Sequence, residues 1–157
     1  MKKFNFVAIL LFLVVFMGCA KETPAAYFKY EEDGDGIVIM GLAKTDLKSI
    51  VIPEIIENSL VICIDDNAFE DCTSLTSVVI PDSVEYIGRY AFRECRSLRS
   101  ITIPNSVTTI GNYAFLSCGV KSITIPDSVT TIGNYAFQYC SGELIINNKI
   151  IETNYSD

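Results

Sequence analysis

Three consecutive stretches of the chain are nearly identical: SLTSVVIPDSVEYIGRYAFREC (Ser74–Cys95), SLRSITIPNSVTTIGNYAFLSC (Ser97–Cys118) and VKSITIPDSVTTIGNYAFQYC (Val120–Cys140). A divergent earlier copy starts as LKSIVIP (Leu47–Pro53), carries a five-residue insertion and continues with NAF from Asn67. Chance does not place the pattern IPxSV three times in register. The chain is therefore a repeat protein with four copies, three of them 22–23 residues apart.

The first half of each copy has the pattern of a short strand. In SLRSITIP, the apolar residues Leu98, Ile101 and Ile103 are interrupted by Ser100 and Thr102. This alternation is typical of a half-buried strand. The proline that follows ends the strand, because proline lacks the N–H that a ladder requires.

The second half of each copy predicts a turn-rich return to the core. We expect Gly111 to adopt a backbone angle that other residues resist. We expect Phe92, Phe115 and Phe137 to form one interior stripe. The other residues of the third copy expected to face inward are Val107, Ile110, Ala114 and Cys118.

One copy cannot fold alone. About eight inward residues contribute roughly 10–18 kcal/mol, at about 1.5–3 kcal/mol for each large one. Ordering 23 backbones costs more, at about 1–2 kcal/mol per residue. Stacked copies cover each other's open faces, so the sequence predicts a mainly β solenoid.

The pattern LxxIxIPxSVxxIGxxAFxxC, over residues 46–140, resembles the BspA-like (Treponema pallidum type) leucine-rich repeat family. The resemblance implies a short right-handed leucine-rich-repeat solenoid with a parallel sheet on one face and short turns or helical turns on the other. It implies secreted or surface-anchored bacterial proteins, several of which adhere to host proteins, matrix or other bacteria. It implies no catalytic residues.

The first residues are typical of an export signal. Lys2 and Lys3 precede an apolar run of 11 residues, 7–17, whereas a membrane span needs about 20. The end of this run, FMGC, resembles a bacterial lipobox in which Cys19 receives lipid. We therefore expect a signal peptide at 1–18 and an exported lipoprotein at the outer membrane or cell surface. Ordinary cleavage or an uncleaved anchor are the alternatives.

The chain on either side of the repeats predicts a tether and two caps. Residues 19–25 are expected to form a polar tether, and residues 26–45 a capping hairpin around EEDGDG. Residues 141–157 are expected to form a strand-turn-strand cap and a polar tail.

Charge and composition exclude several functions. The chain of 157 residues has 12 Lys and Arg, 19 Asp and Glu, and no His, for a net charge of −7. The absence of His excludes Ser-His-Asp and Cys-His catalysis and imidazole metal sites. The acidic balance argues against nucleic acid as a partner. No cofactor is predicted.

The cysteines recur once per copy and are interpreted as a structural ladder. Equivalent side chains in a parallel stack point the same way, which disfavours a disulfide although the Cα atoms come within range. The absence of a CxxC motif argues against a metal. Cys63 lies outside the ladder, aligned with Tyr86, and is a candidate reactive thiol. The ladder comprises Cys72, Cys95, Cys118 and Cys140.

An acidic turn, Asp33–Gly36, resembles part of a calcium loop. An EF-hand series from Glu31 would need Glu at its twelfth position, where Leu42 stands. A hairpin turn is therefore favoured.

The outward strand positions of successive copies form columns of Ser, of Val or Thr, and of basic residues. These columns could receive an acidic protein loop or a glycan, or they could be a solvated sheet face of β-forming residues. A tyrosine ladder could anchor a partner or could pack for shape alone. The candidate surface comprises Lys48, Ser77, Arg99, Ser100, Thr102, Lys121, Ser122, Thr124, Tyr90, Tyr113 and Tyr135.

The function predicted from these features is a non-catalytic, lipid-anchored module, at the cell surface or facing the periplasm, that binds a host or bacterial surface protein or glycan. The first alternative is a truncated structural repeat fragment without its own ligand. A remote alternative is a carboxylate-based hydrolase, which would need two facing carboxylates in a cleft.

Overall fold

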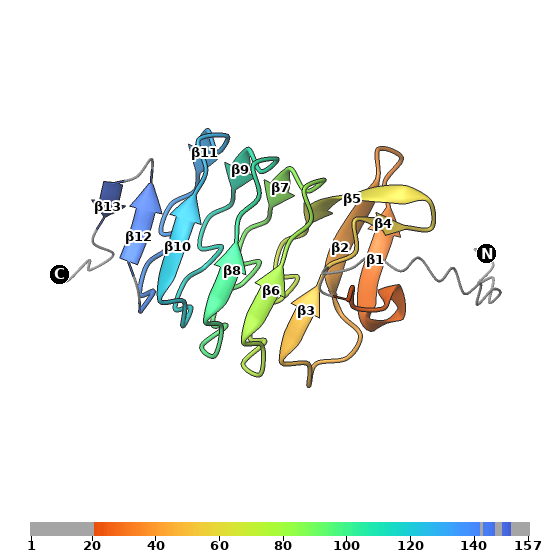
Figure 1. Ribbon diagram of the computed structural model, residues 1–157, viewed down its shortest axis with the longest axis horizontal. Helices are drawn as coiled ribbons and strands as arrows, with labels where there is room; N and C mark the ends of the chain where they lie inside the picture. The colour runs from red at the N-terminus through yellow and green to blue at the C-terminus, as the bar shows by residue number, and fades with distance from the viewer. Residues whose placement is uncertain (1–20, 142, 147–148, 152–157) are drawn as a thin grey trace.

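Four coils stack side by side along the long axis of the protein, as seen in the computed structural model (Figure 1). The structure describes residues 21–141, 143–146 and 149–151. The expected signal peptide, Cys19 and the tail at 152–157 lie outside the described residues. Each coil contributes one strand to a front sheet and another to a second sheet, so the predicted mainly β solenoid is confirmed.

The front sheet contains one strand from each coil and the two strands of the C-terminal cap, and its first half is in strict register. Ser49, Ser77 and Ser100 pair across three parallel strands. β8 and β10 lie side by side without a hydrogen-bonded ladder between them in the described residues. The break falls where the repeat is one residue shorter, at Gly119. The front strands are β3 (Ser49–Val51), β6 (Ser77–Val79), β8 (Ser100–Thr102), β10 (Ser122–Ile125), β12 (Glu143–Ile146) and β13 (Lys149–Ile151).

The second sheet follows the order β1-β2-β5-β7-β9-β11. Cys63 pairs with Tyr86 in this sheet, as the repeat alignment predicts, and Tyr86 pairs with Thr109. The strands are β1 (Phe28–Glu32), β2 (Ile37–Leu42), β5 (Ser59–Ile64), β7 (Tyr86–Ile87), β9 (Thr109–Ile110) and β11 (Thr131–Ile132).

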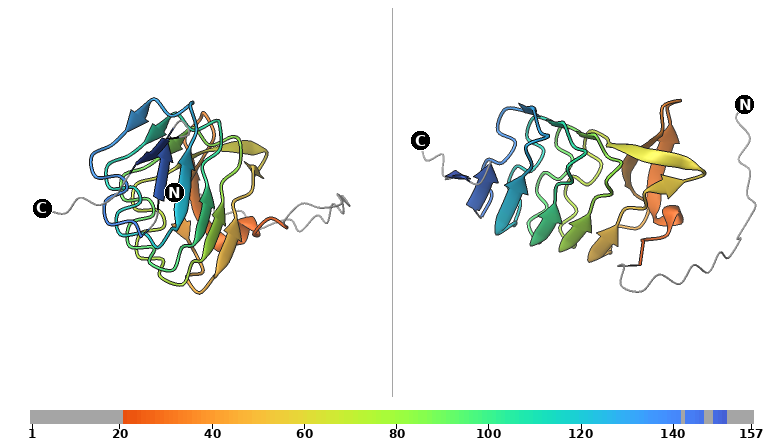
Figure 2. Two further views of the ribbon diagram at one scale, coloured as in Figure 1. Left: turned by 60° about the vertical axis from the view of Figure 1, so that its left-hand side comes forward. Right: turned by 45° about the horizontal axis from the view of Figure 1, so that its top comes forward.

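The two ends of the solenoid carry antiparallel hairpins (Figure 2). Hairpin β1–β2 extends the second sheet, and hairpin β12–β13 extends the front sheet. In the first hairpin, Asp33 Oδ1 accepts the N–H groups of Asp35 and Gly36 at 3.1 and 3.3 Å. The acidic segment is therefore a side-chain-capped turn.

The insertion in the first coil is a further small hairpin. β4 (Ile55–Ile56) pairs antiparallel with the start of β5. Its two-residue turn, Glu57 and Asn58, has φ values of 51° and 70°, as the type I′ turn of tight hairpins requires. The extra residues therefore leave the coil without disturbing the register of the strands that follow.

The core is a column of stacked phenylalanine rings. Phe69, Phe92, Phe115 and Phe137 stack with centroid separations of 5.1, 5.2 and 5.3 Å. The rings of Phe69, Phe92 and Phe115 are completely buried. The expected interior stripe is confirmed, and with it the vertical alignment of equivalent residues.

Backbone hydrogen bonds also join the coils opposite the front sheet. Tyr90, Phe92 and Glu94 donate their N–H groups to carbonyl oxygens of the next coil at 3.1, 2.7 and 2.8 Å. Tyr90 and Glu94 are left-handed, with φ of 58° and 60°, and the same two positions are left-handed in every coil. Alternate N–H groups therefore face the neighbouring coil.

The prediction that Gly111 adopts a backbone angle that other residues resist is wrong. Among the glycines that the structure describes, positive φ occurs at Gly34 and Gly41 and not at Gly111. A Cβ at Gly111 would lie 2.6 Å from the backbone nitrogen of Arg89 and 2.7 Å from the carbonyl carbon of Gly88. Glycine is needed there because the backbone of the preceding coil approaches too closely for any side chain.

Candidate binding surface

The outward side chains of the front strands form the predicted columns. The first column begins each strand and contains Lys48, Thr76, Arg99 and Lys121. The second contains Ser49, Ser77, Ser100 and Ser122, and the third contains Val51, Val79, Thr102 and Thr124. All twelve are exposed or half-buried. We call these three columns together the front face.

The cations of the front face are available to a partner. Lys48, Arg99 and Lys121 are exposed. Within the described part of the chain, the ion pairs are Lys44–Asp46, Arg93–Glu70 and Arg96–Glu94. None of them involves the front face. Three unpaired cations therefore line one edge of a face on an acidic protein.

The hydroxyl groups of the front face are partly engaged with each other and with the backbone. The Oγ atoms of Ser49 and Ser77 are 2.6 Å apart, within hydrogen-bond distance. Thr76 donates its hydroxyl to the carbonyl of Lys48 at 2.7 Å. Ser100, Ser122 and the threonines of the third column are exposed, so the later coils present the freer hydroxyls.

Two grooves lie at the carboxyl ends of the front strands. The larger, of about 410 Å³, lies over β3, β6 and β8 and includes Glu22, Val79 and Asp82. The smaller, of about 290 Å³, lies over β8 and β10 and includes Thr102, Asn105 and Thr124. Thr102 lines both, so the hollows adjoin along one edge of the front face.

The expected tether is shorter than residues 19–25. Thr23 donates its N–H to the Val51 carbonyl at 2.9 Å, and its Oγ1 accepts the Val51 N–H at 2.9 Å. A short 3-10 turn, η1 (Ala25–Tyr27), follows directly. Residues from Thr23 onward therefore belong to the fold, because they cover the outer edge of β3.

The tyrosine ladder lies away from the front face, at the left-handed corners. Tyr90, Tyr113 and Tyr135 stack at 5.0 and 5.4 Å between ring centroids. Their φ values of 57–58° are uncommon for bulky residues. Asn67, of a type that tolerates this conformation, occupies the same place in the first coil. The ladder and the front face are thus two separate surfaces.

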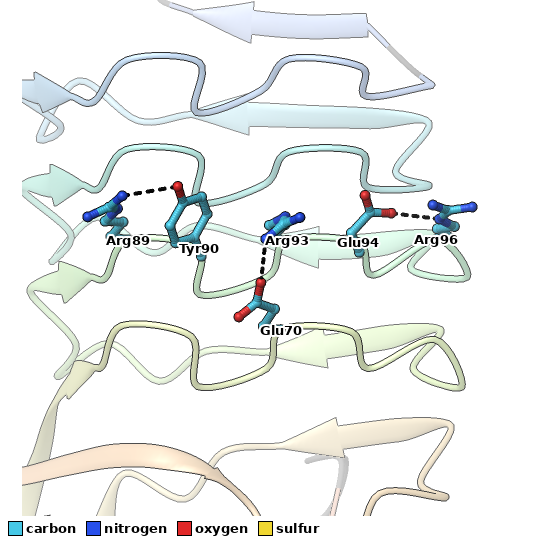
Figure 3. Close-up of polar contacts among 6 residues, drawn as sticks. All are labelled: Glu70, Arg89, Tyr90, Arg93, Glu94 and Arg96. Carbon is cyan, nitrogen blue, oxygen red and sulfur yellow. Dashed lines mark hydrogen bonds and ion pairs between the residues drawn. The ribbon is translucent and has the colours of Figure 1, made fainter.

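Arginines surround the first ring of the ladder (Figure 3). Arg89 lies 4.6 Å from the Tyr90 centroid and donates to the Tyr90 hydroxyl at 3.1 Å. Arg93 lies 5.4 Å from the same centroid and pairs with Glu70 of the preceding coil at 2.7 Å. The two arginines lie against the Tyr90 ring, and Arg93 also joins this coil to the preceding one through Glu70, which favours a packing role for Tyr90.

Three members of the cysteine ladder are hydrogen-bonded through their thiols. Cys95, Cys118 and Cys140 donate to carbonyl oxygens of Phe69, Phe92 and Phe115, each one coil earlier, at 3.1, 2.8 and 3.0 Å. The thiols are therefore donors that link coils as well as small core residues.

Burial keeps the thiols of Cys72, Cys118 and Cys140 protonated. It raises the pKa of Cys72 and of Cys140 to about 11. Contact with the Cys95 thiol, together with burial, raises the pKa of Cys118. A thiol is nucleophilic as thiolate, so these groups are poor nucleophiles at neutral pH.

Cys63 does not have the environment of a reactive thiol. Burial, reinforced by the charge of Asp65, raises its pKa to about 11. Reactive thiols lie in electropositive surroundings, whereas the charged groups acting on Cys63 are carboxylates. The structure argues against the expected reactivity.

The serine of the IPxSV pattern has a role that the sequence reading missed. Ser83 and Ser106 donate their hydroxyls to the carbonyls of Val61 and Val84, both at 2.6 Å. The hydroxyl of Ser128 is buried without a partner. The sequence signal that could have revealed this role is the strict recurrence of a small polar residue beside a buried valine.

Neither a metal centre nor a membrane-spanning helix is found in the described residues. No group of three or more Cys, Asp or Glu side chains in that part of the chain could hold a metal ion. No helix in the same part is long and apolar enough to cross a bilayer.

Comparison with known proteins agrees with this architecture. The sequence model of the "BspA type Leucine rich repeat region (6 copies)" matches residues 62–156. The leucine-rich repeat protein of T. pallidum is similar, with a TM-score of 0.65 and 31% identity, over 80% of this chain and 71% of that one. No curated protein matches the sequence.

Two Bacteroides leucine-rich repeat structures are also similar. The B. capillosus protein has a TM-score of 0.67 and 28% identity, over 80% of this chain and 97% of that one. The B. ovatus protein has a TM-score of 0.58 and 29% identity, over 80% of this chain and 41% of that one. With its repeat pattern, its coils and these matches, the chain belongs to the BspA-type leucine-rich repeat family.

Proposed function

We propose that the protein is a non-catalytic, adhesion-type binding module, and that the front face is its binding surface. The observation that carries the proposal is the row of three exposed, unpaired cations, Lys48, Arg99 and Lys121, beside columns of exposed hydroxyls. A rigid ladder presents these groups at fixed spacing, which lowers the entropy lost on binding.

The partner proposed for this surface is a protein or glycan of a host or bacterial cell. Long-range attraction from the cationic edge would favour partners with acidic groups. Many modest contacts over an extended face then supply affinity, with the cations setting orientation. The proposal needs no catalytic group, cofactor or metal.

We further propose that Cys19 carries lipid and holds the protein at the outer membrane or cell surface. The support is the short apolar segment at 7–17 and the FMGC motif at 16–19. Several acyl chains together anchor a protein stably. Incorporation of a labelled fatty acid that is lost in Cys19→Ser would support this proposal. Protease shaving of intact cells would test exposure at the surface.

Binding of the full chain to a panel of matrix proteins and glycans tests the front face. We expect saturable binding that Arg99→Ala and Lys121→Ala each weaken. Lys29→Ala is the matched control, because Lys29 is an exposed cation on β1, outside the front face. An equal loss of binding in the Lys29→Ala control would indicate that only the net charge matters. No binding to any member would favour the alternative of a structural fragment.

A further inference from the structure

The larger groove interrupts the regularity of the front face. It has a volume of about 410 Å³ and lies where β3, β6 and β8 end. Its lining combines an apolar floor with acidic residues. The lining residues are Glu22, Val51, Ile52, Glu54, Val79, Ile80, Pro81, Asp82, Thr102 and Pro104.

The floor of the groove exposes apolar surface at a position that is polar in later coils. Val79 is 45% exposed, and Thr102 and Thr124 occupy its place in the next two coils. Val51 lies beside Val79 in register on the neighbouring strand. Two adjacent valines and Pro81 can therefore receive an aliphatic segment that the threonine coils would receive less well.

The rim of the groove is acidic. Glu22, Glu54 and Asp82 line it and are exposed, and the ion pairs of the described residues include none of them. The pairing of Thr23 with Val51 brings Glu22 to this position. The chain preceding the repeats thus supplies one carboxylate and the coils supply two.

We propose that this groove receives an arginine or lysine side chain of a polypeptide partner, next to an aliphatic residue. The stem of a long basic side chain packs on apolar surface while its charged end stays at the solvent boundary. Here the stem would lie on Val79 and Pro81, and the charged end would face Asp82, Glu54 and Glu22. Arginine suits this site best, because its planar fork pairs with carboxylates.

This inference rests on the proposed function and narrows the partner to a protein. A neutral glycan has no cation to offer the rim, and the carboxylates would repel an acidic glycan. The cations Lys48 and Arg99 lie at the opposite ends of the same strands. A segment lying along the strands would therefore place its basic residue in the groove and an acidic residue at the other edge.

The direct test uses three capped tripeptides as probes: Leu-Arg-Leu, Leu-citrulline-Leu and Leu-Glu-Leu. Amide NMR shifts of the full chain report where each one binds. We expect Leu-Arg-Leu to shift the amide signals of the non-proline lining residues, above all Val51, Ile52, Glu54, Val79, Ile80, Asp82 and Thr102. We expect the citrulline peptide, which has nearly the same shape without charge, to bind about threefold more weakly, because it loses an exposed charge pair.

Matched variants separate the groove from general electrostatics. Asp82→Asn should weaken Leu-Arg-Leu binding by about threefold, and Val79→Thr should weaken it too. Both substitutions are compatible with folding, because Asn105 and Thr102 occupy these positions in the third coil. Asp127→Asn, the same change at the same repeat position in the last coil, lies outside the lining and should have no effect.

Three outcomes would overturn the inference. They are equal binding of the arginine and citrulline peptides, shifts outside the groove, and equal effects of Asp82→Asn and Asp127→Asn. Spermidine binding as tightly as Leu-Arg-Leu would show a general cation site and would also reject a polypeptide partner.

The fates of the two proposals are distinguishable. If Arg99→Ala abolishes binding of a panel protein while Val79→Thr and Asp82→Asn do not, the proposal for the front face is supported and the proposal for the groove is rejected. If the arginine peptide binds in the groove but no panel member binds the protein, the proposal for the groove is supported and the adhesive role is rejected.

Discussion

The thiol of Cys118 donates a hydrogen bond to the carbonyl oxygen of Phe92, one coil earlier, with a sulfur–oxygen distance of 2.8 Å. The same carbonyl accepts the N–H of Cys95 at 3.3 Å. The carbonyls of Phe69, Phe92 and Phe115 each receive one donor from their own coil and one from the next. The cysteine ladder and the phenylalanine stack are therefore one structure, since the sulfur column fixes the backbone that positions the rings.

Replacing Cys118 by alanine should destabilise the protein by about 1–2 kcal/mol, because a buried hydrogen bond is lost and a small cavity is left. Urea denaturation measures the change. Cys63→Ala serves as the control, since Cys63 is only half-buried and should change stability less. An equal effect of the two substitutions would contradict a special role for the ladder.

Alkaline pH should destabilise the fold through the same thiols. Burial raises the pKa of Cys140 from 9.0 to about 11, so the unfolded chain loses this proton at lower pH than the folded chain. The protonated Cys140 thiol therefore stabilises the folded state fully below about pH 9, and this contribution is lost as the pH rises towards about 11. Urea denaturation at pH 8 and pH 10 should show the loss, and Cys140→Ala should show a smaller one. An identical pH dependence in the variant would contradict the assignment.

Gly111→Ala should cost about 1–3 kcal/mol, because its Cβ would overlap the backbone of the preceding coil, which cannot move aside like a flexible side chain. The nearest atom would lie 2.6 Å away. Thermal unfolding measures the loss, with Thr102→Ala on the exposed front face as control. If Gly111→Ala unfolds at the wild-type temperature, close approach is not the reason for this glycine.

Ser106 and Ser128 offer a matched pair at one repeat position. Ser106→Ala removes a 2.6 Å bond to the Val84 carbonyl and should cost about 1 kcal/mol. Ser128→Ala removes a buried hydroxyl without a partner and should be neutral or stabilising. Equal destabilisation of the two variants in urea would show that Ser128 finds a partner in solution.

Much of the architecture could be predicted because equivalent positions in a repeat share one environment. The alternation around Ile101 and Ile103 predicted strands, and the recurrence of Phe92 and Phe115 predicted an interior column. The front-face columns followed from the same register. These predictions needed only the period of the repeat and the pairing of one strand with the next.

Contacts between coils could not be predicted in the same way. Gly111 was expected to need an unusual backbone angle, yet close approach of another coil explains it. The hydroxyl of Ser106 and the thiol of Cys118 were not recognised as donors, because their acceptors lie more than 20 residues away. The groove was missed because Glu22 belongs to a segment expected to be a free tether.

The sequence by itself determined the period, the strands, the inward and outward columns and the acidic character of this protein. Hydrophobic alternation and repetition are local properties, so they can be seen without coordinates. Only the tertiary structure decided which carbonyl each serine and cysteine meets, where the front sheet loses its ladder, and how Glu22 joins Val79 and Asp82 in a groove. These features depend on the separation of neighbouring backbones, which stacking sets.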